Sequence, residues 1–240
     1  MTTAYVGSEL DVFANAINWK HYAARHLRTF LRGDVLEVGS GLGSMTQVLC
    51  GGAGKWTCLE PDASLSARAK ISLCGTAMDC EFRAGTLDAL GKEESFDAIL
   101  YMDVLEHIAD DRQELDHAAR HLRPSGAICV LAPAHPLLYS VFDRAIGHFR
   151  RYTKTTLSAA GPPGLRLERL RYLDCCGLLA SAANRYIVKS AKPSRWQIAF
   201  WDRILVSLSL VLDPLCGYSV GKSVLAVWRR ERTGLETCST

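Results

Sequence analysis

The sequence lacks the long apolar run that a membrane-spanning helix requires. Its most apolar stretch, residues 204–212, is closed off by charged residues on both sides, whereas a helix needs about 20 apolar residues to cross a bilayer. The first twenty residues also lack the basic start and apolar core of a signal peptide. Nine cysteines without a secretion signal indicate free thiols in a reducing compartment. We therefore expect a cytoplasmic protein without a transmembrane segment.

Two further absences concern metals and charge. No two cysteines form a C-x-x-C pair, so a structural zinc site has little support and we predict no metal. Charge of one sign is not in excess either, because 28 Lys and Arg residues face 25 Asp and Glu residues, a net charge of +3. This balance argues against a general nucleic-acid partner. Hydrophobic residues make up 48% of the 240 residues and charged residues 22%, which excludes a disordered chain and fits a single domain.

Apolar segments of strand length alternate with segments of helical period along most of the chain. We predict strands at 34–38, 56–59, 81–83, 96–102, 127–132, 165–170 and 224–229. Apolar strands that alternate with helices are typical of a parallel sheet covered on both faces, so we predict a doubly wound α/β fold. Residues 123–126, Arg-Pro-Ser-Gly, should end the helix that precedes the fifth strand.

A glycine-rich turn follows the first predicted strand. Gly39, Gly41 and Gly43 have G-x-G-x-G spacing, and glycines at a strand end let the backbone approach a ligand closely. A dinucleotide fingerprint would place its third glycine at position 44, where the sequence has Ser44. Glu60 ends the second strand 21 residues after Gly39, where an open α/β sheet places a carboxylate for the ribose hydroxyls of a nucleoside.

Four segments in this order resemble the motifs of class I S-adenosylmethionine-dependent methyltransferases. They are VLEVGSGLG, CLEPD, FDAILYMDVLEHI and LRPSGAICVLAP, and together they cover about residues 30–135. The resemblance implies a seven-stranded sheet with the last strand antiparallel, and S-adenosylmethionine as cofactor. It implies one domain over 1–240, with N-terminal helices (1–32), a cofactor-binding core (33–135), a substrate loop and helix (136–160) and a helical insertion or lid before the last strand (174–218).

The same resemblance assigns the cofactor contacts residue by residue. The expected contacts are Glu37, Gly39, Gly41, Gly43, Glu60, Pro61, Asp62, Gly85, Thr86, Leu87, Tyr101, Met102 and Asp103. Several acidic residues lie between positions 103 and 116, and we interpret them as the solvated start of a helix. Asp103 is the exception, because it lies at the end of a strand.

The segment after the fifth strand resembles that of small-molecule methyltransferases and supplies candidates for the acceptor side. A hydroxyl acceptor benefits from a positioned base, and we predict His135, His148 and Tyr152 as the catalytic candidates; for His107 a structural role at a helix start is preferred. The substrate contacts that we predict are Tyr139, Arg150, Arg151 and Trp196. Because neighbouring arginines point apart, one should pair with Asp143 and the other should meet an anionic group of the acceptor.

Several alternatives stay open from the sequence. A nucleotide-cofactor oxidoreductase and a catalytically silent cofactor-binding subunit are the alternative functions. The apolar face of residues 196–212 fits core packing, a substrate-facing wall, or a peripheral membrane or dimer contact. The predicted partner is a small-molecule acceptor and not a nucleic acid, its methylated atom is undetermined, and the protein is a monomer or homodimer.

Overall fold

The computed structural model describes residues 10–51, 54–74 and 80–232. Within these ranges it contains a seven-stranded sheet with the order β3-β2-β1-β4-β5-β7-β6, in which β7 runs antiparallel to both of its neighbours. The strands are β1 (Val35–Val38), β2 (Trp56–Glu60), β3 (Cys80–Ala84), β4 (Phe96–Met102), β5 (Leu122–Pro133), β6 (Leu165–Leu173) and β7 (Ser223–Arg230). The predicted α/β fold with an antiparallel last strand is confirmed.

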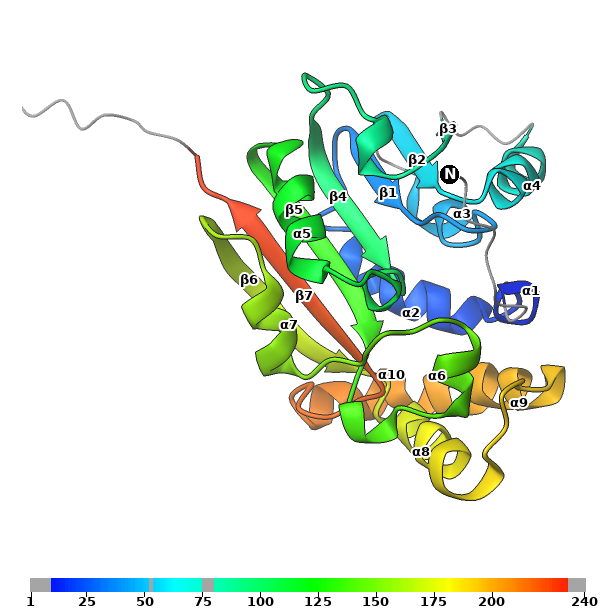
Figure 1. Cartoon of the computed structure of the whole chain (residues 1–240). Coiled ribbons are helices and arrows are strands. Elements are labelled where there is room, and N and C mark those ends of the chain that lie inside the picture. The colour runs from blue at the N-terminus through cyan, green and yellow to red at the C-terminus, as the bar shows by residue number, and fades with distance from the viewer. Residues whose placement is uncertain (1–9, 52–53, 75–79, 233–240) are drawn as a thin grey trace, which may run out of the picture.

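Both faces of the sheet are covered, which explains why the strands are apolar throughout (Figure 1). Alternate residues of β1 enter different clusters: Val35 packs with Leu27 of one helical layer, and Leu36 packs with Leu115 of the other. The first layer contains α2 (Ile17–Leu27), α3 (Thr46–Leu49), α9 (Arg195–Phe200) and α10 (Val206–Leu215). The second contains α5 (Asp111–Arg120) and α7 (Lys154–Ala160).

Further helical segments precede the insertion. They are α1 (Leu10–Phe13), α4 (Ala63–Leu73), η1 (Leu87–Ala89), η2 (Leu105–His107), η3 (Pro136–Leu138) and α6 (Val141–Ala145). The insertion before β7 contains α8 (Cys175–Ala183) and the π-turns η4 (Asn184–Val188) and η5 (Trp201–Leu205), together with α9 and α10. In Figure 1, α6 and the insertion gather beyond the carboxyl ends of β4 and β5.

Buried aspartates hold the insertion in place. The Asp174 carboxylate, which is fully buried, accepts hydrogen bonds from Trp201 Nε1 (2.7 Å) and Ser209 Oγ (2.7 Å). Asp202 accepts one from the backbone N–H of Trp19 (2.8 Å), and Asp213 accepts one from the hydroxyl of Tyr22. Because buried charges must be paired in this way, the insertion is fixed both to α2 and to the end of β6.

The structure differs from the predicted boundaries at the start of β5. The predicted helix break at 123–126 lies instead inside this strand, and α5 already ends at Arg120. The register with β4 shifts between the pairs Phe96–Leu122 and Ala98–Ala127, which is an irregularity that accommodates extra residues in one strand. Pro124 is tolerated because it lies in this irregular part of the strand.

Two sequence expectations also concern the described part of the chain. The eight cysteines there form no disulfide with one another, and Cys238 lies outside the described ranges. None of the described helices is long and apolar enough to cross a bilayer.

Candidate active site

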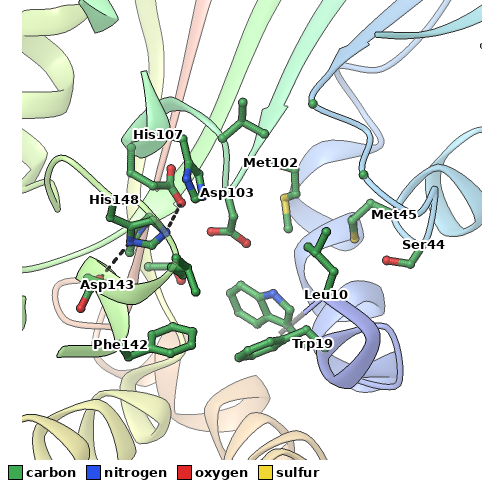
Figure 2. A pocket seen from close by; sticks show the side chains of 18 of the residues that line it. Leu10, Trp19, Ser44, Met45, Met102, Asp103, His107, Phe142, Asp143 and His148 are labelled. Atoms are coloured by element: carbon green, nitrogen blue, oxygen red, sulfur yellow. Dashed lines mark hydrogen bonds and ion pairs between the residues drawn. The ribbon is translucent and has the colours of Figure 1, made fainter. Parts of the chain in front are cut away.

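A cavity of about 920 Å³ opens at the carboxyl ends of the parallel strands. Its lining includes the last residues of β1, β2, β4 and β5, and residues of α1, α2 and the insertion close it from the other side. This volume is typical of a site for small molecules, and the carboxyl edge is where open α/β sheets bind ligands. Figure 2 shows Asp103, His107 and His148 on one side of the cavity and Ser44 and Met45 on the other.

The three glycines of the turn after β1 have different roles. All three have positive φ angles, +70° for Gly39, +54° for Gly41 and +71° for Gly43. A Cβ at Gly39 would lie 2.5 Å from a methyl group of Val104, and one at Gly43 would lie 3.0 Å from Leu73 Cδ1. At Gly41 the same position is open, with only Leu10 Cδ1 at 3.9 Å. Gly41 therefore provides room for a ligand, while Gly39 and Gly43 allow close packing.

Glu60 is held against this turn by backbone donors. One oxygen of its carboxylate accepts the N–H of Gly41 (2.8 Å) and the other accepts the N–H of Asp62 (3.0 Å). Burial raises the pKa of this carboxyl group. A carboxylate offers about four acceptor positions, so acceptor capacity remains for hydroxyl donors in the cavity. This geometry fits the predicted ribose contact.

Glu37 lies deeper, below the glycine turn. Its carboxylate, 2% exposed, accepts hydrogen bonds from Thr46 Oγ1 (2.7 Å) and Trp56 Nε1 (2.8 Å). Burial raises the pKa of Glu37 to about 7, although these two donors oppose the shift. The folded protein therefore keeps a proton on Glu37 at pH values where the unfolded chain has lost it.

Replacing Glu37 by glutamine should make the stability of the protein less dependent on pH. A raised folded pKa favours folding below the unfolded value of 4.5, and this contribution is lost as pH rises to about 7. Above pH 7 the Glu37→Gln variant should gain up to about 3 kcal/mol relative to wild type, because the neutral amide oxygen can accept the same two hydrogen bonds. Urea unfolding of both proteins at pH 5 and pH 8 measures this, and an equal difference at both values would contradict it.

The opposite end of the cavity combines aromatic rings with buried charges. Trp19 of α2 and Trp201 of the insertion flank the Lys222 ammonium, which lies 3.5 Å from the centroid of the Trp201 ring. Burial lowers the pKa of Lys222. Asp103, at the end of β4, has a φ angle of +53°, and burial raises the pKa of its carboxyl group. This end of the cavity therefore combines apolar ring surfaces with ionisable groups.

A second group of ionisable residues lines the cavity beside Asp103. Asp143 is fully buried and accepts hydrogen bonds from Arg151 Nε (2.7 Å) and from His148 Nδ1 (3.0 Å). His107 lies edge-to-face against His148, with ring centroids 4.5 Å apart, and burial lowers the pKa of His107 to about 4. Glu106 was expected to lie in a solvated helix start, but it is fully buried because the short turn η2 directs it inward.

Twelve of the predicted site residues line this cavity. They are Glu37, Gly39, Gly41, Glu60, Pro61, Gly85, Thr86, Met102, Asp103, His148, Arg151 and Trp196. The structure brings them together around one space, and their roles toward cofactor and acceptor stay predictions.

The other predicted cofactor residues lie behind the cavity wall. Gly43 packs against α4, Asp62 caps that helix by accepting the N–H of Ser64 (2.8 Å), and the Leu87 side chain belongs to the core. Tyr101 is fully buried, and its hydroxyl donates to Glu114 (2.9 Å). The side chains of Leu87 and Tyr101 point into the sheet layers, and the cofactor contacts of these residues stay predictions.

Four predicted acceptor residues also point elsewhere. A ring nitrogen of His135 lies 2.9 Å from the Gly221 carbonyl oxygen, and Tyr152 donates to Asp111 (2.8 Å). The Arg150 guanidinium pairs with the same aspartate (2.7 Å), and the Tyr139 hydroxyl donates to the His148 carbonyl oxygen (2.6 Å). None of these four lines the main cavity, and their catalytic and acceptor roles stay predictions.

Sequence reasoning missed several residues of the cavity wall. Phe13, Trp19 and Lys222 come from the two ends of the described chain, and no motif connects them. Their approach depends on the contacts between α2 and the insertion, which local sequence patterns do not report.

Comparisons with known proteins find similar methyltransferases. Residues 36–130 match the family model of a methyltransferase domain. The ubiquinone biosynthesis O-methyltransferase of Paramagnetospirillum magneticum is 30% identical over 113 residues, 45% of each chain. The demethylmenaquinone methyltransferase of Tropheryma whipplei is 29% identical over 126 residues, 52% of each chain. The chain thus spans about half the length of the curated relatives it matches.

Solved structures extend the likeness of fold over nearly the whole chain. A methyltransferase in complex with the Trm112 activator of Haloferax volcanii has a TM-score of 0.64 at 18% identity, over 95% of this chain and 99% of that one. The N-methyltransferase NodS of Bradyrhizobium japonicum, in complex with S-adenosylhomocysteine, has a TM-score of 0.60 at 15% identity, over 95% and 94%. Together with the sheet order, these findings show that residues 36–130 are similar to a methyltransferase domain and that the described chain has the fold of these solved methyltransferases.

Proposed function

We propose that this protein transfers the methyl group of S-adenosylmethionine to an oxygen of a small-molecule acceptor. The observation that carries the proposal is that the turn at Gly41, the Glu60 carboxylate and the group around Asp103 and His148 line one cavity. The names of the curated relatives, which are mainly O-methyltransferases, support an oxygen as the acceptor atom. A cytoplasmic location stays a prediction.

The cofactor side of the cavity fits a nucleoside with a sulfonium arm. S-adenosylmethionine supplies a methyl group that a nucleophile takes by in-line displacement, so holding the reactants in line is most of the catalytic task. The open position at Gly41 gives room for the ligand, and the spare acceptor capacity of Glu60 suits two ribose hydroxyls. In this proposal Met102 and Asp103 lie next to the arm that carries the methyl group.

The acceptor side is formed by rings and by the insertion. Phe13, Phe142 and Trp201 surround the space beyond Asp103, with ring centroids 5.9 Å apart for Phe13–Trp201 and 6.3 Å for Phe13–Phe142. These walls exclude water and suit a ring-containing acceptor. We propose that the insertion, which places Trp196 at the cavity, forms the outer wall over the acceptor.

The proposal does not include an anionic group held by arginine. Arg150 pairs with Asp111 outside the main cavity, and Arg151 is bound to Asp143. In this geometry each guanidinium already has a carboxylate partner within the protein.

Replacing Glu60 by alanine should weaken the binding of S-adenosylhomocysteine by about 1–3 kcal/mol, because charged hydrogen bonds are lost. Isothermal titration calorimetry measures this. The matched control is Glu168→Ala, which removes a carboxylate of β6 that pairs with Arg229 away from the cavity. Binding of NAD as tight as that of S-adenosylhomocysteine would favour the oxidoreductase alternative. Turnover can be tested by screening phenols and catechols as acceptors and measuring the release of S-adenosylhomocysteine. A protein that binds the cofactor but turns over no acceptor would favour the silent-subunit alternative.

A further inference from the structure

Glu106, His107 and His148 form a compact cluster at the cavity wall. Glu106 and His107 belong to η2, directly after β4, and His148 follows α6. One potential ligand atom from each side chain lies within 4.8 Å of the other two. All three residues line the same cavity as Asp103, so a small ion could reach the cluster from the cavity.

The Glu106 carboxyl group is the unusual member of this cluster. It is fully buried, and neither of its oxygens has a hydrogen-bond partner in the described part of the chain. Burying an ionised carboxylate without a partner is costly unless a cation compensates its charge. One potential cation beside it is the imidazole of His148, whose Nε2 lies 3.7 Å from Glu106 Oε1, beyond hydrogen-bond distance.

The His148 ring is oriented as a metal-binding imidazole would be. Its Nδ1 lies 3.0 Å from the Asp143 carboxylate, which leaves Nε2 as the nitrogen that faces the cluster. Asp143 is itself fixed by Arg151 and by the backbone N–H and hydroxyl of Ser140, both at 2.8 Å. A carboxylate behind an imidazole fixes the tautomer and orientation of metal-binding histidines.

We propose that Glu106, His107 and His148 bind one divalent transition-metal ion, of which Zn²⁺ and Mn²⁺ are representative. Two imidazoles and one carboxylate form a ligand set that such ions accept, whereas Mg²⁺ prefers oxygen ligands alone. Ligand atoms around such an ion lie about 3.3 Å apart, so the side chains would have to close in by about 1 Å. The proposal differs from our prediction from the cysteine spacing, which was that the protein binds no metal.

Three protein ligands leave further coordination positions open. Because all three residues line the cavity, these positions would face the acceptor space, and the ligand class that fits them is an oxygen donor such as a hydroxyl or carbonyl group. This part of the inference rests on the proposed methyl transfer to oxygen. The metal would hold the acceptor oxygen close to Asp103, on the side of the cavity where Figure 2 shows both histidines.

The test is a titration of the full chain, dialysed against EDTA, with Mn²⁺ followed by electron paramagnetic resonance. We expect one bound ion per chain. Zn²⁺ should displace it at equal concentration and Mg²⁺ should not, because nitrogen ligands favour Zn²⁺. Glu106→Gln and His107→Gln should each weaken Mn²⁺ binding at least tenfold. The control His117→Ala removes a histidine that lies 3.8 Å from Asp88 outside the cavity and should leave the affinity unchanged.

Calorimetry with S-adenosylhomocysteine on the same samples separates this inference from the proposed function. Retained cofactor binding in Glu106→Gln, with Mn²⁺ binding lost, supports the site. The metal site is overturned if the wild type binds no ion, or if both cluster variants bind Mn²⁺ with unchanged affinity. His148, paired with Asp143, would then remain as a base for the same reaction. Failure of the wild type to bind S-adenosylhomocysteine would contradict the proposed function instead.

Discussion

Replacing Gly41 by valine should weaken the binding of S-adenosylhomocysteine more than a hundredfold. A Cβ at this position would meet only Leu10 Cδ1, at 3.9 Å, so we expect the side chain to project into the space that the ligand needs. A branched residue also resists the φ angle of +54°, and a shift of the backbone would move the N–H that Gly41 donates to Glu60. Calorimetry should detect no binding at ligand concentrations that saturate the wild type.

Gly217 provides a matched control for the strain in the backbone. Its φ angle is +58°, and a Cβ there would meet nothing within 4 Å. Gly217→Val should lower the melting temperature to a similar extent as Gly41→Val and leave the affinity for S-adenosylhomocysteine unchanged. If the Gly41 variant binds within tenfold of the wild type, the ligand does not lie against this turn.

Asp143→Ala should destabilise the protein by about 3–5 kcal/mol, because it leaves the buried guanidinium of Arg151 without its carboxylate. Arg151 donates to both oxygens of Asp143, at 2.7 and 2.9 Å, and its side chain is only 9% exposed. Ser140 and His148 lose their common acceptor in the same variant. Chemical unfolding at pH 7 measures the difference. Asp34→Ala is the control, because Asp34 pairs with Arg123 at 2.9 Å but is 38% exposed, and such pairs contribute less than about 1 kcal/mol.

The effect of Asp143→Ala should also depend on pH in a defined direction. Burial raises the pKa of Asp143, but the hydrogen bonds from His148 and Arg151 outweigh it and hold the pKa well below the ordinary value of 3.8. Its stabilising contribution is therefore present above that value and is lost as pH falls below it. The difference between variant and wild type should be constant from pH 6 to 8 and should narrow below about pH 4. A difference that instead narrows with rising pH would contradict this account.

The sheet could be predicted from the sequence because strands buried on both faces are apolar at nearly every position. Residues 96–102 are apolar at nearly every position, and β4 has the predicted bounds. Sequence spacing could predict that Gly41 and Glu60 lie together at the cavity, because both residues end or follow neighbouring parallel strands. The start of β5 could not be placed, since Pro124 and Gly126 normally end an element and only pairing with β4 keeps them in a strand.

The acceptor side was harder to predict because its residues depend on tertiary contacts. His135 and His148 both follow β5 in the sequence, yet His135 has a φ angle of +63° and its ring stacks on Tyr172, away from the cavity. His148 reaches the cavity because its backbone N–H donates to the Asp143 carbonyl oxygen. Position after a strand identifies the correct edge of the sheet, but it does not determine which way a side chain turns. Glu106 shows the same limit, because its burial follows from the tight turn η2.

The buried aspartates of the insertion also constrain when the acceptor end of the cavity can form. The contacts of Trp19 with Asp202 and of Tyr22 with Asp213 join residues 183 and 191 positions apart. Synthesis proceeds from the N-terminus, so the glycine turn and Glu60 leave the ribosome long before these partners exist. Contacts between residues so far apart in the sequence form slowly, because forming them requires the loss of the conformational entropy of the long intervening chain. The end of the cavity at the glycine turn can therefore assemble on a nascent chain, whereas the end at Trp19 and Trp201, where we propose that the acceptor binds, is completed only after residue 213 has been made.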